Sequence, residues 1–172
     1  MQAFPPTLRV PPDGRWRSTS SRVTSKRKAA DDRRHAAPRV AVVSSGILRR
    51  VRRIALALPE VNERTSHGEP CFFVRDQRPL CYFHENHNGD GRVSLWCPLP
   101  DGVQEELVSA EPSRFFAPVT SASGVFAKWI GVYLDTTGED RVDWVEVAAI
   151  VEDAYRHVAP KALVNTLDRR SR

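Results

Sequence analysis

The sequence predicts an α+β fold, a two-layer domain in which an antiparallel sheet packs against an N-terminal and a C-terminal helix. Three observations indicate it. A helical pattern of apolar residues begins at residue 47, short strand-like segments joined by turn residues lie between residues 71 and 97, and a second helical pattern begins at residue 144. Strands that follow one another in sequence and are bracketed by helices are typical of this fold class.

The first predicted helix covers residues 47–58. Apolar residues recur along it at the spacing of one helix face, at Ile47, Leu48, Val51, Ile54, Ala55 and Leu58. Ser44 or Ser45 can cap the N-terminus, and Pro59 ends the helix because proline lacks the amide hydrogen that a helix interior needs.

Short apolar segments rich in aromatic and β-branched residues predict strands at residues 71–74, 80–83, 93–97 and 129–134. The run Asn88-Gly89-Asp90-Gly91 predicts a hairpin turn, since Asn-Gly and Asp-Gly pairs adopt positive φ at little cost. A short helix is expected over residues 103–110, ended by Pro112.

The final predicted helix begins after Asp143, which can cap it, with Glu146 in the position that completes a capping box. Its apolar face consists of Trp144, Val147, Ala148, Val151, Ala154, Tyr155 and Val158. Pro160 ends it.

The net positive charge of the chain lies before the predicted domain. The net charge is +5, but residues 1–46 hold ten basic and three acidic residues, whereas residues 47–172 hold sixteen basic and eighteen acidic ones. Residues 1–44 lack apolar periodicity, so we predict a disordered basic tail there, and the single methionine at position 1 is compatible with a true start near Val40. We predict an α+β domain over residues 45–163 and a basic C-terminal end over residues 164–172.

Composition predicts a cytoplasmic protein with no membrane association. No run of about 18 apolar residues exists, which a membrane-spanning helix would require, and the first residues lack the apolar core of a signal peptide. The three cysteines, Cys71, Cys81 and Cys97, form no CxxC pair and are typical of reduced, buried thiols.

Arginines on the first helix are the candidate nucleic-acid-binding residues. Arg49, Arg50, Arg52 and Arg53 lie off its apolar face, and Lys161 begins a second basic stretch near the C-terminus. Guanidinium groups match phosphate geometry, so this face is a candidate for contacts with the DNA backbone. The alternative is a solvated face on which Arg52 or Arg53 pairs with carboxylates.

Two further groups of residues have side chains of the types found in metal sites and catalytic sites. Cys81, His84 and His87 are zinc-ligand types at a spacing of three residues, with Cys97 conceivable as a fourth, but neighbouring strand residues alternate faces and the set is incomplete. We therefore predict no metal and no cofactor.

The hydrolase-like set Ser66, His67 and Glu69 is too close in sequence to align as nucleophile, base and orienting group. We predict no catalytic residue in the chain. The tryptophans and tyrosines, Trp129 and Tyr133 among them, are expected mostly in the core, although such residues on an exposed sheet face would stack on bases.

Several segments resemble the MmcQ/YjbR-like family. They are residues 51–59, the run Thr65-Ser66-His67-Gly68-Glu69-Pro70, residues 129–135, and residues 143–161. The resemblance implies a frataxin/CyaY-like arrangement described as a double-wing DNA-binding type. It carries over no catalytic residue.

The sequence therefore predicts a cytoplasmic, non-enzymatic domain that binds DNA weakly and with little sequence preference through its arginine-lined helix. The alternative is a protein-interaction or small-ligand-binding module without a nucleic-acid role, which the −2 charge of residues 47–172 favours. Iron handling of the frataxin kind is not expected, because the first helix presents arginines instead of acidic residues.

Overall fold

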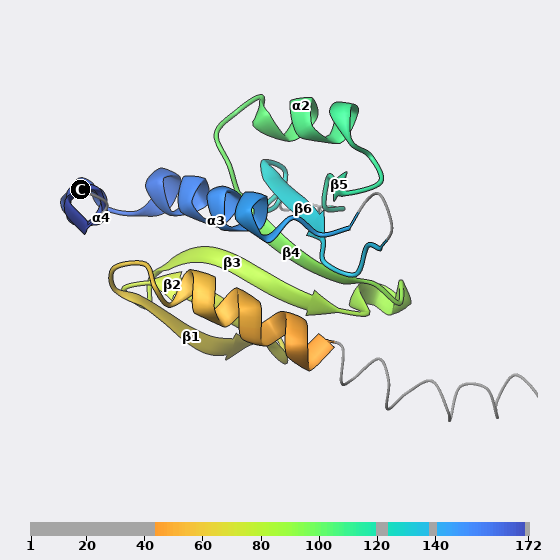
Figure 1. Cartoon of the computed structure of the whole chain (residues 1–172), viewed down its shortest axis with the longest axis horizontal. Helices are drawn as coiled ribbons and strands as arrows, with labels where there is room; N and C mark the ends of the chain where they lie inside the picture. The colour runs from red at the N-terminus through yellow and green to blue at the C-terminus, as the bar shows by residue number, and fades with distance from the viewer. Residues whose placement is uncertain (1–43, 120–123, 138–140, 171–172) are drawn as a thin grey trace, which may run out of the picture. The chain divides into compact units, whose positions relative to one another are not determined.

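The computed structural model describes residues 44–119, 124–137 and 141–170 (Figure 1). All of them belong to one compact unit, residues 41–172. Residues 1–43 of the predicted basic tail, with the alternative start near Val40, lie outside the described residues, whereas Ser44 is buried in the first helix. Within the described ranges, no helix is both long and apolar enough to cross a membrane.

A six-stranded antiparallel sheet forms the centre of this unit, with strand order β1-β2-β3-β4-β6-β5. The strands are β1 (Val61–Ser66), β2 (Glu69–Val74), β3 (Arg78–Glu85), β4 (Val93–Pro98), β5 (Phe115–Phe116) and β6 (Trp129–Tyr133). Consecutive strands β1 to β4 pair with their sequence neighbours, so each connection is a hairpin.

The first helix, residues 44–55, and α3 (Trp144–Val158) pack on the sheet, and the unit also contains α2 (Val103–Ala110) and α4 (Lys161–Arg170). In Figure 1 the first helix (orange) and α3 (blue) run beside each other. Val51 and Ala55 from the first helix and Val151 from α3 are fully buried in one core with Phe72 and Leu95 of the sheet. The fold is therefore α+β with an N-terminal and a C-terminal helix, as predicted.

Strand register separates the side chains of the sheet into two faces. Partners across an antiparallel pair lie on the same face, and the row Phe83–Leu95–Val132 belongs to the core beneath the helices. The row Tyr82–Trp96 and its continuation across Gly131 to Phe116 lies on the opposite face.

Asp143 caps α3 as predicted. Its carboxylate accepts hydrogen bonds from the backbone N–H groups of Val145 at 2.8 Å and Glu146 at 3.3 Å. The reciprocal half of the capping box is not made, because the Glu146 carboxylate contacts the guanidinium of Arg114 instead.

Strand β1 was not predicted from the sequence. Its residues are mostly polar and none is fully buried, as expected for an edge strand that lacks an apolar pattern. The segment Ser66-His67-Gly68-Glu69 is the tight turn of the β1–β2 hairpin, with φ of 53° at His67 and 85° at Gly68. Positive φ at both central residues is the requirement of a two-residue type I′ hairpin loop.

The chain end also differs from the prediction. Residues 164–172 were expected as a separate basic end, but α4 continues to Arg170 and buries Leu163 and Leu167 in the core. An ion pair of 2.9 Å between Arg156 of α3 and Asp168 of α4 adds to this contact. Leu163 and Leu167 lie four residues apart, so they share one face of α4 and pack on the core together. The domain therefore extends at least to Arg170.

Candidate functional site

The arginines of the first helix differ in what they contact. Arg49, Arg50 and Arg53 are exposed to solvent, as an anion-binding surface requires. Arg52 instead donates two hydrogen bonds of 2.7 Å to the carboxylate of Glu63 on β1, and this interaction raises the pKa of Arg52. Arg52 therefore mainly links the first helix to the edge strand β1. This is the alternative given for it above, in which it pairs with a carboxylate.

The other three arginines line an open groove beside the first helix. The opposite wall comes from the segment after β6 and from the start of α3, residues 134–137 and 141–145, together with Arg114. The guanidinium of Arg50 lies 5.1 Å from the centre of the Trp144 ring, a cation–π contact across the groove. Arg114 and Arg141 were missed by the sequence argument because the chain brings them to the helix only through the sheet.

This groove brings together four arginines that have no carboxylate partner among the described residues. They are Arg49, Arg50, Arg53 and Arg141. Arg114 is paired with Glu111 at 2.5 Å and with Glu146. The groove can therefore attract an anion without first breaking a salt bridge at those four positions.

Asp135, an acidic residue of the groove, is already held by Arg92. Arg92 donates to both carboxylate oxygens at 2.8–3.0 Å, and the backbone N–H of Val93 donates a further bond of 3.1 Å. Burial alone would raise the pKa of Asp135, but these hydrogen bonds outweigh it and the pKa is lowered. Asp135 is consequently ionised and compensated, and it repels an incoming anion less than a free carboxylate would.

Lys161 does not join these arginines. It begins α4, beyond the C-terminal end of α3, whereas the groove lies at the N-terminal end of α3. The 15 residues of α3 span roughly 22 Å at 1.5 Å per residue. The five candidate residues therefore do not form one surface.

The aromatic residues of the second sheet face pack on one another. Trp129 is 7 % exposed and Trp96 is 4 % exposed, and the ring of Phe126 lies 5.1 Å and 5.4 Å from them, centre to centre. The ring of Tyr133 is covered by the guanidinium of Arg92 at 3.8 Å. The expectation that these rings are mostly buried is confirmed for Trp96 and Trp129.

Ser66, His67 and Glu69 do not line up as a catalytic set. Ser66 Oγ lies 3.1 Å from Nδ1 of His67 on the exposed hairpin turn, but Glu69 extends to His84 instead of orienting His67. A base that no third group orients lacks the arrangement of a catalytic triad.

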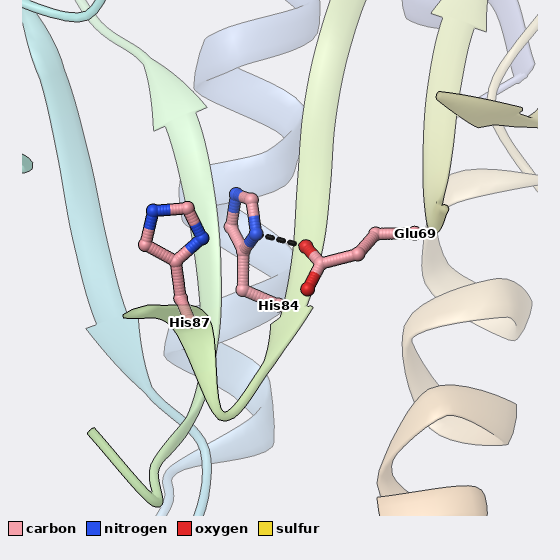
Figure 2. Close-up of side chains that lie close together, drawn as sticks. All are labelled: Glu69, His84 and His87. Atoms are coloured by element: carbon pink, nitrogen blue, oxygen red, sulfur yellow. Dashed lines mark ion pairs between the residues drawn. The ribbon is translucent and has the colours of Figure 1, made fainter. Parts of the chain in front are cut away.

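The cysteine and the histidines considered as metal ligands lie on opposite faces of β3. Cys81 is fully buried under the helices beside Cys97, its cross-strand neighbour, and burial raises the pKa of the Cys81 thiol well above its usual range. His84 lies on the other face, and His87 follows on the short turn after β3. In Figure 2, Glu69 of β2 lies beside His84, so a carboxylate accompanies the two histidines instead of the Cys81 thiol.

Burial shifts the pKa values of Glu69 and His84, which lie in contact. His84 is 7 % exposed, and burial lowers its pKa to about 4, with the nearby His87 contributing. Burial raises the pKa of Glu69. The approach of Nδ1 to the carboxylate would count as an ion pair only if His84 were protonated, and the lowered pKa makes it neutral at pH 7. The contact therefore joins a neutral imidazole to a carboxyl group whose pKa burial has raised.

Comparisons with known proteins identify the family. The YjbR family model matches residues 56–157, more than half of the chain. The structure is similar to the crystal structure of Deinococcus radiodurans protein DR2400, described with the family-model domain DUF419, with a TM-score of 0.51 and 18 % sequence identity over 69 % of this chain and 85 % of that one. That likeness supports the fold alone. No curated protein matches the sequence. Because the family model spans most of the described sheet and α3, the chain belongs to the YjbR family.

Proposed function

We propose that this domain binds DNA through its phosphate backbone, weakly and with little sequence preference, in the groove between the first helix and α3. The observation that carries the proposal is the convergence of Arg49, Arg50, Arg53 and Arg141 on one groove without carboxylate partners among the described residues. These arginines come from segments about 90 residues apart in sequence, so the fold itself gathers the charge.

The chemistry of the groove suits phosphate groups. A guanidinium group donates paired hydrogen bonds that match phosphate oxygens, and each phosphate that it neutralises releases counterions from the DNA. Contacts of this kind position a protein on DNA without reading its sequence. Because residues 47–172 carry more acidic than basic residues, the attraction is local to the groove and the affinity is low.

The proposal includes a non-enzymatic role in the cytoplasm. The buried free thiols Cys71, Cys81 and Cys97 support a reducing compartment, where such thiols persist. The unaligned Ser66, His67 and Glu69 support binding without catalysis.

Paired charge variants of residues 41–172 test the groove. The groove variant changes Arg49, Arg50 and Arg53 to Gln, and the matched control changes Lys161, Arg169 and Arg170 of α4 to Gln. Both remove three positive charges from exposed positions. We expect the groove variant to lose at least about tenfold in affinity for a short duplex at low salt, in fluorescence anisotropy, because the affected charges are those that contact phosphate.

The control should lose clearly less affinity than the groove variant, since its charges lie farther from the groove and salt screens distant charges more than near ones. Equal losses in both variants would show that net charge alone drives binding. No measurable binding in the wild type would leave the alternative, a protein-interaction or small-ligand module. That alternative is favoured by Val145, an apolar groove residue that is 80 % exposed.

A further inference from the structure

We propose that Glu69, His84 and His87 form a binding site for a divalent transition-metal ion of the zinc class. One donor atom from each residue lies within 4.8 Å of the others. Two imidazoles and one carboxylate are a donor set found in zinc sites and in other transition-metal sites that keep open coordination positions. The inference concerns side chains outside the arginine groove and is independent of DNA binding.

The fold places these donors together for a clear reason. Cys71 on β2 pairs with Tyr82 on β3, and continuing this antiparallel register by two residues brings Glu69 opposite His84. His87 follows on the short 3-10 turn His87–Gly89, and its ring lies 4.5 Å from that of His84, centre to centre. The donors thus come from the end of one hairpin and the turn that follows it (Figure 2).

His84 supplies a second and independent observation. It is 7 % exposed, yet neither of its ring nitrogens has a hydrogen-bond partner among the described residues, and the same holds for Oε2 of Glu69. Nδ1 of His84 lies against that oxygen without the geometry of a hydrogen bond. Buried polar atoms are nearly always paired, because leaving one unpaired costs roughly 1–3 kcal/mol. A metal ion would satisfy these groups.

The surroundings of His84 suit metal binding. A metal ligand must offer a lone pair, and a neutral imidazole offers one on its unprotonated ring nitrogen. Aromatic rings surround that imidazole, with the Trp96 ring 4.2 Å and the Tyr82 ring 6.2 Å from it, centre to centre. These rings fix its orientation and exclude water from one side. His87 is half-buried on a short turn, so its side chain can close the remaining distance.

Metal titration of the full chain tests the site. Protein stripped with chelator is titrated with Zn²⁺ by calorimetry, and with Co²⁺ by visible absorption, which reports imidazole and carboxylate ligation. We expect one tight equivalent per chain, an increase in thermal midpoint on binding, and weaker binding as the pH falls and protons compete for the ligands.

Single substitutions then locate the ion. Glu69→Gln and His87→Gln each remove a ligand at partly exposed positions and should weaken Zn²⁺ binding by at least about tenfold, the loss that even indirect partners of a metal cause. His67→Gln is the matched control, because His67 is an exposed histidine two residues from Glu69. Circular dichroism of metal-free variants checks folding.

Three results would overturn the inference. They are no stoichiometric binding in the wild type, equal affinity in the wild type and both ligand variants, or an equal loss in the His67→Gln control. Retained binding in both ligand variants would place the ion elsewhere, for example on the tail.

Discussion

At the scale of single residues, Gly131 shows how one position shapes the second face of the sheet. A Cβ atom at this position would lie 2.2–2.5 Å from three ring atoms of Phe116, its partner on β5. The absence of a side chain lets that ring lie across β6, where it packs 4.6 Å from Tyr133 and 6.2 Å from Trp96, centre to centre.

Gly131→Ala should therefore destabilise the domain by roughly 1–3 kcal/mol, the usual cost of overpacking. In a Phe116→Ala background the same change should cost much less, because the obstructing ring is gone. Urea unfolding of the four proteins of this cycle measures the coupling. An identical cost in both backgrounds would show that the ring does not occupy the space above Gly131.

His84 makes stability depend on pH. Its folded pKa of about 4 lies below the ordinary value of 6.5, so the unfolded state binds more protons between these values. Stability contributed by the neutral form is present above pH 6.5 and is lost as pH falls toward 4. The raised pKa of Glu69 acts in the opposite direction.

We therefore expect the free energy of unfolding of metal-free protein to fall from pH 6.5 to pH 4. A His84→Gln variant should show a flatter profile over this range, and His67→Gln should keep the wild-type slope. Chemical denaturation at several pH values provides the measurement. Parallel profiles for wild type and His84→Gln would contradict the assignment of His84 as a buried neutral imidazole.

At the scale of elements, the prediction from sequence succeeded where apolar periodicity is strong. The helices at each end and the central strands were found because their apolar residues repeat at the period of the element that they form. The Asp143 cap was found from its capping-box spacing to Glu146. Strand β1 was missed because an edge strand of polar residues has no such pattern, and α4 was missed because Pro160 was interpreted as the end of the last helix.

The residues of the candidate sites also divide into those that the sequence alone predicts and those that only the fold brings together. The arginines of the first helix could be predicted because they lie on one element, whereas Arg141 joins them only through the folded chain. Glu69 meets His84 through strand register, but the first predicted strand began only at residue 71 and so left Glu69 outside the sheet. The sequence positions of Glu69 and His84 predict their contact only when the register of the β2–β3 hairpin between them is known.

Helix α4 should contribute to stability although most of it lies beyond the predicted domain. Leu163→Ala removes a side chain that is 5 % exposed in the core, and large-to-small changes of this kind cost roughly 2–5 kcal/mol. Val164→Ala, one position further and only half-buried, is the control with a smaller expected loss. Equal small effects in thermal or urea unfolding would mean that α4 does not pack on the domain in solution.

At the scale of the whole molecule, charge is distributed unevenly. The foldable segment is nearly neutral, yet the fold gathers four unpaired arginines in one groove, and the segment before residue 47 carries most of the net charge. Any affinity of the full chain for DNA combines these two sources. The domain contribution is visible only when residues 41–172 are studied by themselves.

The salt dependence of DNA binding by residues 41–172 is the most direct test of the account. Folding is first checked by a cooperative thermal transition. Each neutralised phosphate contributes roughly 0.9 to the slope of log affinity against log salt, so contacts from about three arginines predict a slope near −3, reduced toward zero when Arg49, Arg50 and Arg53 are changed to Gln. A folded domain that binds no DNA at low salt, while the full chain binds, would contradict the proposed function of the groove.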